Sequence, residues 1–457
     1  MTATEPPKLK FHRAAEQAIN QSAMDLLANV VEHKLKPNTP PDFPSNRPAP
    51  ARITDKEMLD VPLLFKRDIF GNIVARYFPH DDGKIYGLGT DAYQLLRRAA
   101  DQALKTQWVR QLAGRAYVED HLFLWCRKSF REDKPQPFTE YLEGRTTSEL
   151  CLTPVWVPVA LLEVEEDLPF GPGKFSPMTA ALFDEHEARY IEGAPARADD
   201  IKSLFASKRE KYQGRAAVVL EIQAVRGYAL ERAVELAEDM VGLLRLYSPA
   251  AAVPWLVCPS AIAGTEYEPN TTAISYGRDG TFQMSQGALK PFPFPWQIST
   301  KRWAEISANH LSALAKLIGE GAGLSELQLR LRTSILTYSK GLTMRTPADR
   351  LVYSLSALES LFLRDSSEPI QQNLGERLAF LLHKDTAQRQ NIVRTVRAAY
   401  NLRSRYIHHQ QSIAEDTALA DFFPIAASAL FTTLANVEKF ATPLDFIDAI
   451  DHVKFGG

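Results

Sequence analysis

Residues 386–409 read TAQRQNIVRTVRAAYNLRSRYIHH and form the most regular helical pattern in the C-terminal third of the chain. Successive side chains of a helix are about 100° apart, so its apolar residues fall on one stripe. That stripe consists of Ile392, Val396, Ala399, Tyr400 and Ile407. We therefore expect an amphipathic helix over Thr386–Ile407 that packs one face against a helical core.

One arginine of this helix, Arg403, lies in the middle of the apolar stripe, whereas Arg394, Arg397 and Arg405 lie outside it. The outer three are candidates for holding an RNA phosphate backbone, and such binding would weaken with salt. An ordinary solvated basic face explains the same pattern equally well.

The preceding two helical periods supply the groups that face Arg403. The stripe Ile370, Leu374, Leu378, Leu381 includes Arg377, and the stripe Leu351, Leu355, Leu358, Phe362 has Glu359 at its edge. A guanidinium keeps its proton and needs a partner when buried.

We therefore expect Glu359 to pair with Arg377 inside the bundle. That leaves Arg403 at a cleft or subunit contact beside His408 and His409, where imidazole and guanidinium suit phosphodiester chemistry. The alternative is that Arg403 extends along the bundle edge and the histidines are surface residues.

Residue types, helix order and spacing over roughly residues 333–440 resemble the ApeA-like branch of the HEPN superfamily. The positions that carry the resemblance are Ala357-Leu358-Glu359, Leu374, Glu376-Arg377-Leu378-Ala379, Tyr400, Leu402-Arg403-Ser404 and Ile407-His408. The resemblance implies an all-helical domain that pairs with a second copy, so that both copies of an Arg-x4–6-His motif meet at the interface.

The resemblance also implies a metal-independent ribonuclease that needs no cofactor. RNA's own 2′-hydroxyl attacks the adjacent phosphorus, leaving a cyclic phosphate and a 5′-hydroxyl, while Arg403 stabilises the phosphorane and His408 moves the proton. His409 also satisfies the spacing and stays an alternative catalytic imidazole. Ser404 stands where the family often has Asn, Asp or His, and Glu359, Arg377 and Tyr400 are expected to support the site.

The composition fits a multidomain α+β protein: 457 residues, 45% hydrophobic and 24% charged, with a net charge of −2 that gives no global attraction for nucleic acid. We expect an exposed amphipathic helix over His12–Leu35 and a Pro-rich linker up to residue 50. A mixed α/β region over residues 51–300 follows, and then an all-α HEPN helical bundle over residues 301–457. The boundary is the segment Pro291–Trp296, because its prolines forbid regular structure.

The pattern of apolar residues also predicts individual elements. In the α/β region it predicts a helical segment over Thr90–Arg131, strands over Cys151–Val164, and a β–α–β unit of Ala217–Leu220, Leu230–Leu246 and Val253–Val257. In the C-terminal part it predicts helices over Trp303–Leu317, Leu324–Lys340, Pro347–Leu363, Pro369–His383, Thr386–Ile407 and Asp416–Phe440.

Cys126, Cys151 and Cys258 are odd in number and far apart, which favours free thiols in a reducing cytoplasm. We expect neither a secretion signal nor a membrane span.

The leading hypothesis is a cytoplasmic, homodimeric endoribonuclease of bacterial anti-phage defence, whose α/β region responds to a phage or cellular trigger or positions the substrate. A non-catalytic HEPN dimer that binds RNA or a protein partner is the alternative. A hydrolase within the α/β region is disfavoured, since no set of nucleophile, base and orienting group stands out there.

Overall fold

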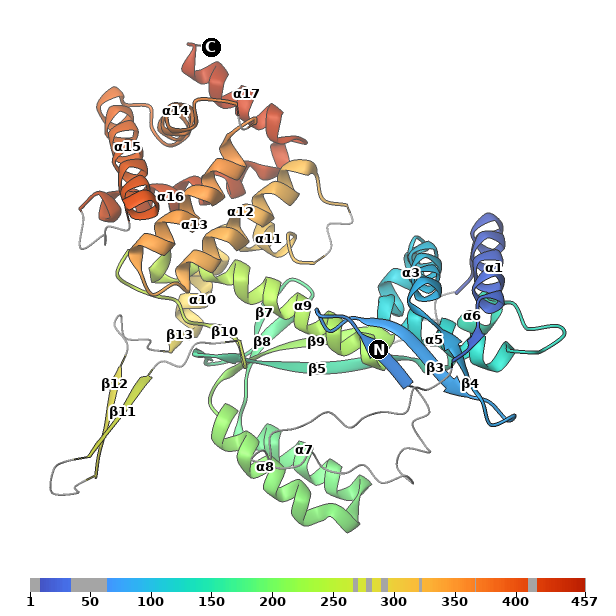
Figure 1. Ribbon diagram of the computed structural model, residues 1–457. Coiled ribbons are helices and arrows are strands. Elements are labelled where there is room, and N and C mark those ends of the chain that lie inside the picture. Colours follow the sequence, from blue (N-terminus) through green and yellow to red (C-terminus); the bar gives the residue numbers. More distant parts are fainter. Residues whose placement is uncertain are drawn as a thin grey trace. The chain divides into compact units, whose positions relative to one another are not determined.

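The structure is a computed structural model, and it describes residues 9–33, 64–265, 270–276, 282–288, 295–319, 323–365, 367–409 and 417–456. The chain is mixed α/β, with sheets in the N-terminal part and a helical C-terminal region (Figure 1). The Pro-rich linker, and residues 291–294 of the expected boundary, lie outside the described residues.

Contacts divide the chain into two compact units, and each unit combines two stretches of sequence. Unit 1 contains Met1–Thr153 and Ile222–Glu231, and unit 2 contains Pro154–Glu221 and Arg232–Gly457. This division differs from the boundaries expected at residues 50 and 300. The physical reason is that β5 (Leu150–Ala160), β9 (Ala216–Val225) and α9 (Arg226–Leu244) each contribute residues to both units.

Unit 1 combines a small antiparallel sheet in the strand order β1–β4–β3–β2 with a group of helices. Its elements are α1 (Arg13–Ala28), β1 (Val31–Glu32), β2 (Leu64–Arg67), β3 (Ile73–Pro79), β4 (Ile85–Leu88), α3 (Thr90–Leu104), α4 (Gln107–Leu112), α5 (Gly114–Ser129) and α6 (Phe138–Glu149). The helical segment expected over Thr90–Arg131 is thus three helices. The last break falls at Gly114, whose φ of +72° suits glycine alone, and where a Cβ would overlap the Tyr228 ring.

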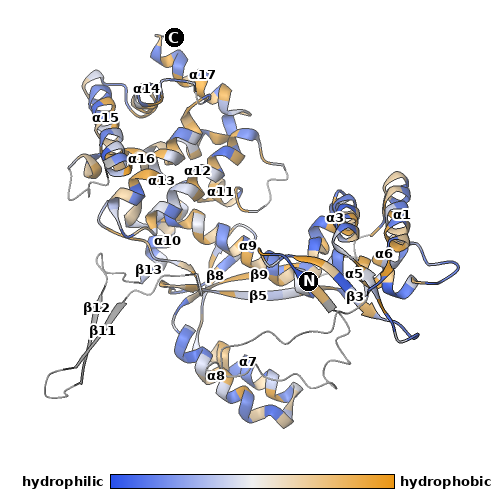
Figure 2. Cartoon of the chain, in the orientation of Figure 1, coloured by the Kyte–Doolittle hydropathy of each residue, from blue (hydrophilic) through white to orange (hydrophobic). Residues whose placement is uncertain are grey.

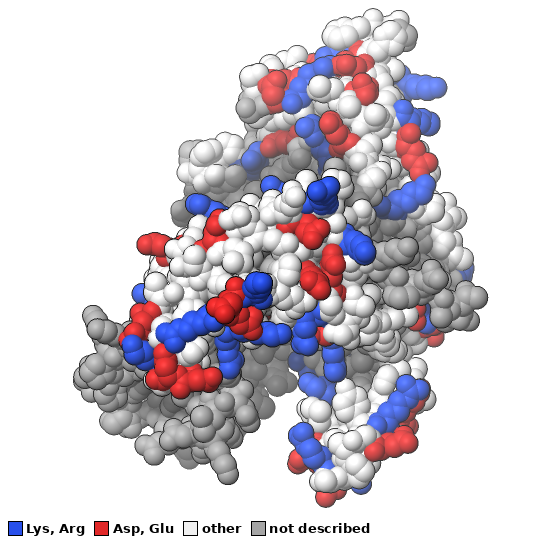
Figure 3. Space-filling view, turned by 90° about the vertical axis from the view of Figure 1, so that its right-hand side faces the viewer, with Lys and Arg blue, Asp and Glu red and all other residues white. Residues whose placement is uncertain are grey.

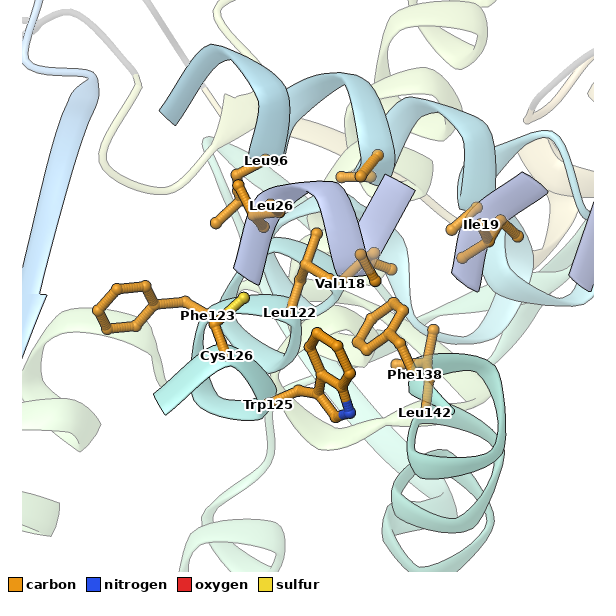
Figure 4. Packing of buried hydrophobic residues seen from close by; sticks show 14 of the residues in the cluster. Ile19, Leu26, Leu96, Val118, Leu122, Phe123, Trp125, Cys126, Phe138 and Leu142 are labelled. Carbon is orange, nitrogen blue, oxygen red and sulfur yellow. The ribbon is translucent and has the colours of Figure 1, made fainter. Parts of the chain in front are cut away.

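Helix α1 is amphipathic, as the sequence predicts, but it is not an exposed helix. Ile19, Ala23 and Leu26 are completely buried and pack in one cluster with residues of α3, α5 and α6 (Figure 4). The helix therefore belongs to the core of unit 1, because its apolar stripe is covered by three helices that follow it in sequence.

The sheet of unit 2 has the strand order β10–β5–β9–β8–β7. The further strands and helices of this part are β6 (Leu162–Val164), β7 (Leu168–Phe170), β8 (Gly173–Pro177), α7 (Ala180–Gly193), α8 (Ala198–Tyr212), β10 (Ala261–Ile262), β11 (Asn270–Tyr276), β12 (Phe282–Ala288) and β13 (Trp296–Ile298). The strands predicted over Cys151–Val164 and Ala217–Leu220 and the helix predicted over Leu230–Leu246 are confirmed. The strand predicted over Val253–Val257 is wrong, because these backbone carbonyls bind an arginine side chain instead of a neighbouring strand.

The C-terminal region is built from α10 (Thr300–Ser307), α11 (Leu311–Ala315), α12 (Glu326–Leu342), α13 (Pro347–Phe362), α14 (Ile370–Leu382), α15 (Thr386–His409), α16 (Thr417–Asn436) and α17 (Pro443–Lys454). Figure 2 shows hydrophobic and hydrophilic residues alternating along these helices, as expected where one face packs and the other is solvated. The single helix expected over Trp303–Leu317 is wrong, because His310 adopts a left-handed conformation with a φ of 60° and separates α10 from α11. Helix α17 was not predicted.

Local signals in the sequence set the start and the close packing of α13. Thr346 caps the helix by accepting from the Asp349 backbone N–H, and Pro347 occupies its first turn. Helix α12 approaches α13 closely at Gly341, where an added Cβ would lie 2.8 Å from the Tyr353 Cβ. Helices α13, α14 and α16 all contact α15 and hold it in the bundle.

One described segment, Thr417–Lys439, is long and apolar enough to cross a membrane by length and composition alone. Half of its most apolar window is buried inside the structure. Its core residues include Phe422, Phe423 and Leu430, all without exposed surface. The segment therefore packs as a core helix of the bundle.

Candidate functional site

The site predicted from the sequence centres on a cluster of three side chains between α13 and α15. Arg403 donates from Nη1 to Glu359 Oε1 over 2.8 Å, and the Tyr400 hydroxyl donates to the same oxygen over 2.8 Å. The side chains of Arg403 and Glu359 are 28% and 20% exposed, so the pair is reachable from solvent. Burial, reinforced by the hydrogen bond to Glu359, raises the pKa of Tyr400, which keeps its proton and acts as a donor.

The expectation that Glu359 pairs with Arg377 is wrong. Arg377 is buried on α14 and is bound by the carboxylates of Glu368 and Asp451 and by the Phe362 carbonyl. Helical phase correctly placed both arginines toward the interior, but it did not identify their partners. Glu359 faces α15, and Arg377 faces α17 and the connection before α14.

Asp451 was missed because helix α17 was missed, although the sequence contains a signal for it. Thr442, Pro443 and Asp445 repeat the pattern that starts α13: a capping threonine, a first-turn proline and an acidic third residue. In the structure Thr442 and Asp445 form a capping box at this position. Recognising it would have added this helix, and with it Asp451, to the predicted bundle.

The predicted catalytic imidazoles lie at the C-terminal end of α15. His408 is exposed, while the side chain of His409 lies outside the described residues. On a continuous helix, side chains five residues apart point about 140° away from each other, so Arg403 and His408 project toward different sides of α15. The structure therefore brings Arg403 together with Glu359 and Tyr400, and it does not bring it together with His408 within one chain.

Two further residues of this helix end lie on the surface. Ser404 is exposed, and Ile407 is 47% exposed although the sequence placed it in the apolar stripe. The core contact near this end comes from Leu402, which is 4% exposed. Near its C-terminal end the buried face of α15 therefore includes Leu402, and Ile407 is left uncovered.

A contact that sequence reasoning missed fixes the end of α15. The Tyr406 hydroxyl donates to Asp349 Oδ1 over 2.8 Å, and this bond raises the pKa of Tyr406. Asp349 lies in the first turn of α13, next to the capping Thr346. The turn that carries His408 is thus tied to the start of α13.

The candidate RNA-binding arginines Arg394, Arg397 and Arg405 are all exposed, as predicted. Helix α15 contains five arginines and no acidic residue, which makes it locally basic in a chain of nearly balanced charge. Figure 3 shows basic and acidic side chains interspersed over one face of the molecule, without a field of one sign. Attraction for a phosphate backbone is accordingly a local property of α15.

A second buried arginine, Arg350, was not anticipated. Its side chain is 1% exposed and donates to backbone carbonyls of Ala250, Val253, Pro254 and Leu256. Burial lowers the pKa of Arg350 to about 10, so it keeps its charge at neutral pH. Every residue has a backbone carbonyl, so the sequence contained no signal that these four would bind Arg350.

Within the described part of the chain, no group of three or more His, Cys, Asp or Glu side chains is arranged to hold a metal ion. The three cysteines are free, with Cys126 and Cys258 buried and Cys151 exposed. Comparisons with protein-family models, with curated proteins and with solved structures found no match.

Proposed function

We propose that this protein is a metal-independent HEPN endoribonuclease. The proposal is supported by one observation above all: the helix whose last turn carries exposed His408 also holds a half-buried Arg403, whose guanidinium is oriented by Glu359. In the proposed reaction the 2′-hydroxyl attacks the adjacent phosphorus and the bond to the 5′-oxygen breaks. His408 transfers the proton, and Arg403 stabilises the negative charge on the phosphorane.

The geometry of α15 favours a site made by two copies of the chain. Because Arg403 and His408 point about 140° apart on one helix, one phosphate can contact both groups more easily between two copies of α15. Ile407, which is 47% exposed beside His408, supplies an apolar surface for such a contact. The proposal therefore includes a homodimer formed through the C-terminal helices.

The biological setting we propose is cytoplasmic anti-phage defence, which rests on the resemblance to ApeA-like proteins. In this setting RNA is the substrate and a phage or cellular trigger releases the activity. The α/β region would respond to that trigger.

The decisive test incubates the wild-type chain and four variants with total RNA in the presence of EDTA. Arg403→Ala and His408→Ala should abolish cleavage, and His409→Ala decides between the two imidazoles. His452→Ala, which changes an exposed histidine of α17 outside the site, is the matched control. Toxicity on expression should follow the same pattern, which covers an enzyme that needs a cellular trigger. RNA left intact by the wild type, together with equal toxicity of all variants, would overturn the proposal.

The second candidate is a non-catalytic HEPN dimer that binds RNA or a protein partner. The ion pair with Glu359 favours it, because a guanidinium neutralised by a carboxylate stabilises the bundle without any reaction. Ser404, a weaker orienting group than those the family often has, points the same way. Tight binding of RNA that stays intact and causes no toxicity would identify this function.

A further inference from the structure

The segment between α9 and the sheet strand β10 displays two large apolar side chains on the surface of unit 2. Trp255 is 64% exposed and its neighbour Leu256 is 39% exposed. Neighbouring exposed apolar side chains are candidates for contact with a ligand or partner.

The backbone that carries Trp255 is held on both sides by one buried side chain. Arg350 Nη1 donates to the carbonyl of Pro254 and to the carbonyl of Leu256, and Arg350 Nη2 donates to the Ala250 carbonyl over 2.6 Å. The guanidinium also lies over the Phe423 ring, 4.8 Å from its centroid.

Helix α12 fixes both ends of the same segment. The Tyr338 hydroxyl donates to the Ala251 carbonyl, and the Cys258 N–H donates to the Leu342 carbonyl over 2.9 Å. Trp255 therefore protrudes from a rigid backbone, and binding to it carries little cost of ordering the loop.

Contacts connect this segment to the end of α15. Arg350 binds the carbonyls beside Trp255, and the preceding residue, Asp349, accepts the hydrogen bond from Tyr406. His408 follows Tyr406 by two residues on α15. The first turn of α13 thus contacts both the backbone that carries the exposed indole and the proposed catalytic end of α15.

We propose that Trp255 is a stacking platform for an unpaired base of single-stranded RNA. The inference rests on the proposed function and names its substrate class. An exposed indole can stack on any base, because every base has a π face, and the basic α15 attracts the phosphates that follow. The platform selects RNA with unstacked bases over duplex RNA, whose bases are already stacked.

The test measures binding of labelled single-stranded and duplex RNA of the same sequence to the full chain carrying both His408→Ala and His409→Ala, so that neither candidate imidazole can support cleavage. In that background, Trp255→Ala removes the platform, Trp255→Phe retains an aromatic face, and Phe455→Ala removes another exposed aromatic as the control. Circular dichroism and thermal melting of each variant confirm that it is folded.

Trp255→Ala should weaken single-strand binding on the order of tenfold, whereas Trp255→Phe and Phe455→Ala should stay near the parent protein. Duplex binding should be unchanged by all three. Unchanged single-strand binding by Trp255→Ala overturns the platform and leaves the ribonuclease intact, since cleavage by Trp255→Ala with His408 present would persist.

Two other outcomes also overturn the platform. Loss of the dimer in Trp255→Ala with unchanged RNA binding would make the indole a contact between copies. Absence of RNA binding in every variant, together with absence of cleavage by the wild type, would overturn the proposed function as well.

Discussion

Replacing Arg377 with methionine should destabilise the C-terminal bundle strongly. The Arg377 side chain is 4% exposed and makes five hydrogen bonds, two to Glu368, two to Asp451 and one to the Phe362 carbonyl. Methionine keeps a similar apolar stem and removes only the charge and the donors. The variant leaves Glu368 and Asp451, which are 14% and 18% exposed, without their main cation.

The expected loss is about 3–5 kcal/mol, the usual effect of breaking a buried pair by removing one partner. The lower half of that range is the better expectation, because Arg364 remains and donates to Asp451 Oδ2 over 3.0 Å. Exposed Arg394, changed to methionine as the control, should alter stability by less than about 0.5 kcal/mol.

The destabilisation should shrink in acid. The hydrogen bond from Arg377 lowers the pKa of Glu368. Burial alone would raise the pKa of Asp451, but the hydrogen bonds from Arg377 and Arg364 outweigh it, so that this pKa is lowered as well. A carboxylate with a lowered folded pKa contributes stability that is present above its unfolded pKa and lost as pH falls through the folded value. The difference between wild type and variant should therefore be full near neutral pH and decline below the ordinary Glu and Asp values of 4.5 and 3.8.

Hydrogen exchange of α14 and α17 measures this effect locally, which suits a chain with two units. A loss near 3 kcal/mol corresponds to exchange on the order of a hundredfold faster in these helices. Exchange that changes no more than in Arg394→Met would refute the view that this arginine anchors the bundle. A destabilisation that grows in acid would refute the assigned carboxylate partners.

Three further expectations concern the site and its surroundings. Glu359→Gln should retain the fold and lower the rate of RNA cleavage about tenfold or more, because Arg403 loses its orienting charge; unchanged kcat would contradict this. Arg350→Met should destabilise the protein by about 3 kcal/mol and speed proteolysis near Trp255, because four backbone carbonyls lose their hydrogen-bond donor. Resistance to proteolysis equal to that of the wild type would contradict this role of Arg350. Sedimentation at micromolar concentration should show a dimer, and a monomer there would rule out the paired motif.

The helices that carry the candidate site could be predicted from the sequence, because their signals are local. Helical phase predicted α13, α14 and α15 and turned Arg377 and Arg403 toward the interior. The same reasoning placed Glu359 at the edge of its stripe, where the structure finds it between α13 and α15.

The partners of these side chains were harder to predict. Helical phase gives the direction in which a side chain points, but it does not identify the helix that lies in that direction. Glu359 was assigned to Arg377 and in fact binds Arg403 and Tyr400. The run Val253–Val257 looked like a strand because a short apolar run does not reveal where its carbonyls bind. Pro254 was the one local warning against a central strand.

The ends left on the cleaved RNA distinguish attack by the 2′-hydroxyl from attack by water. RNA cleaved by the wild type should carry 2′,3′-cyclic phosphate and 5′-hydroxyl ends, because the attacking oxygen is the 2′-hydroxyl of the RNA itself. A substrate with a single 2′-deoxynucleotide at the mapped position should resist cleavage at that linkage alone. Cleavage that persists there, or products with 5′-phosphate ends, would contradict the assignment of Arg403 and His408 to this reaction.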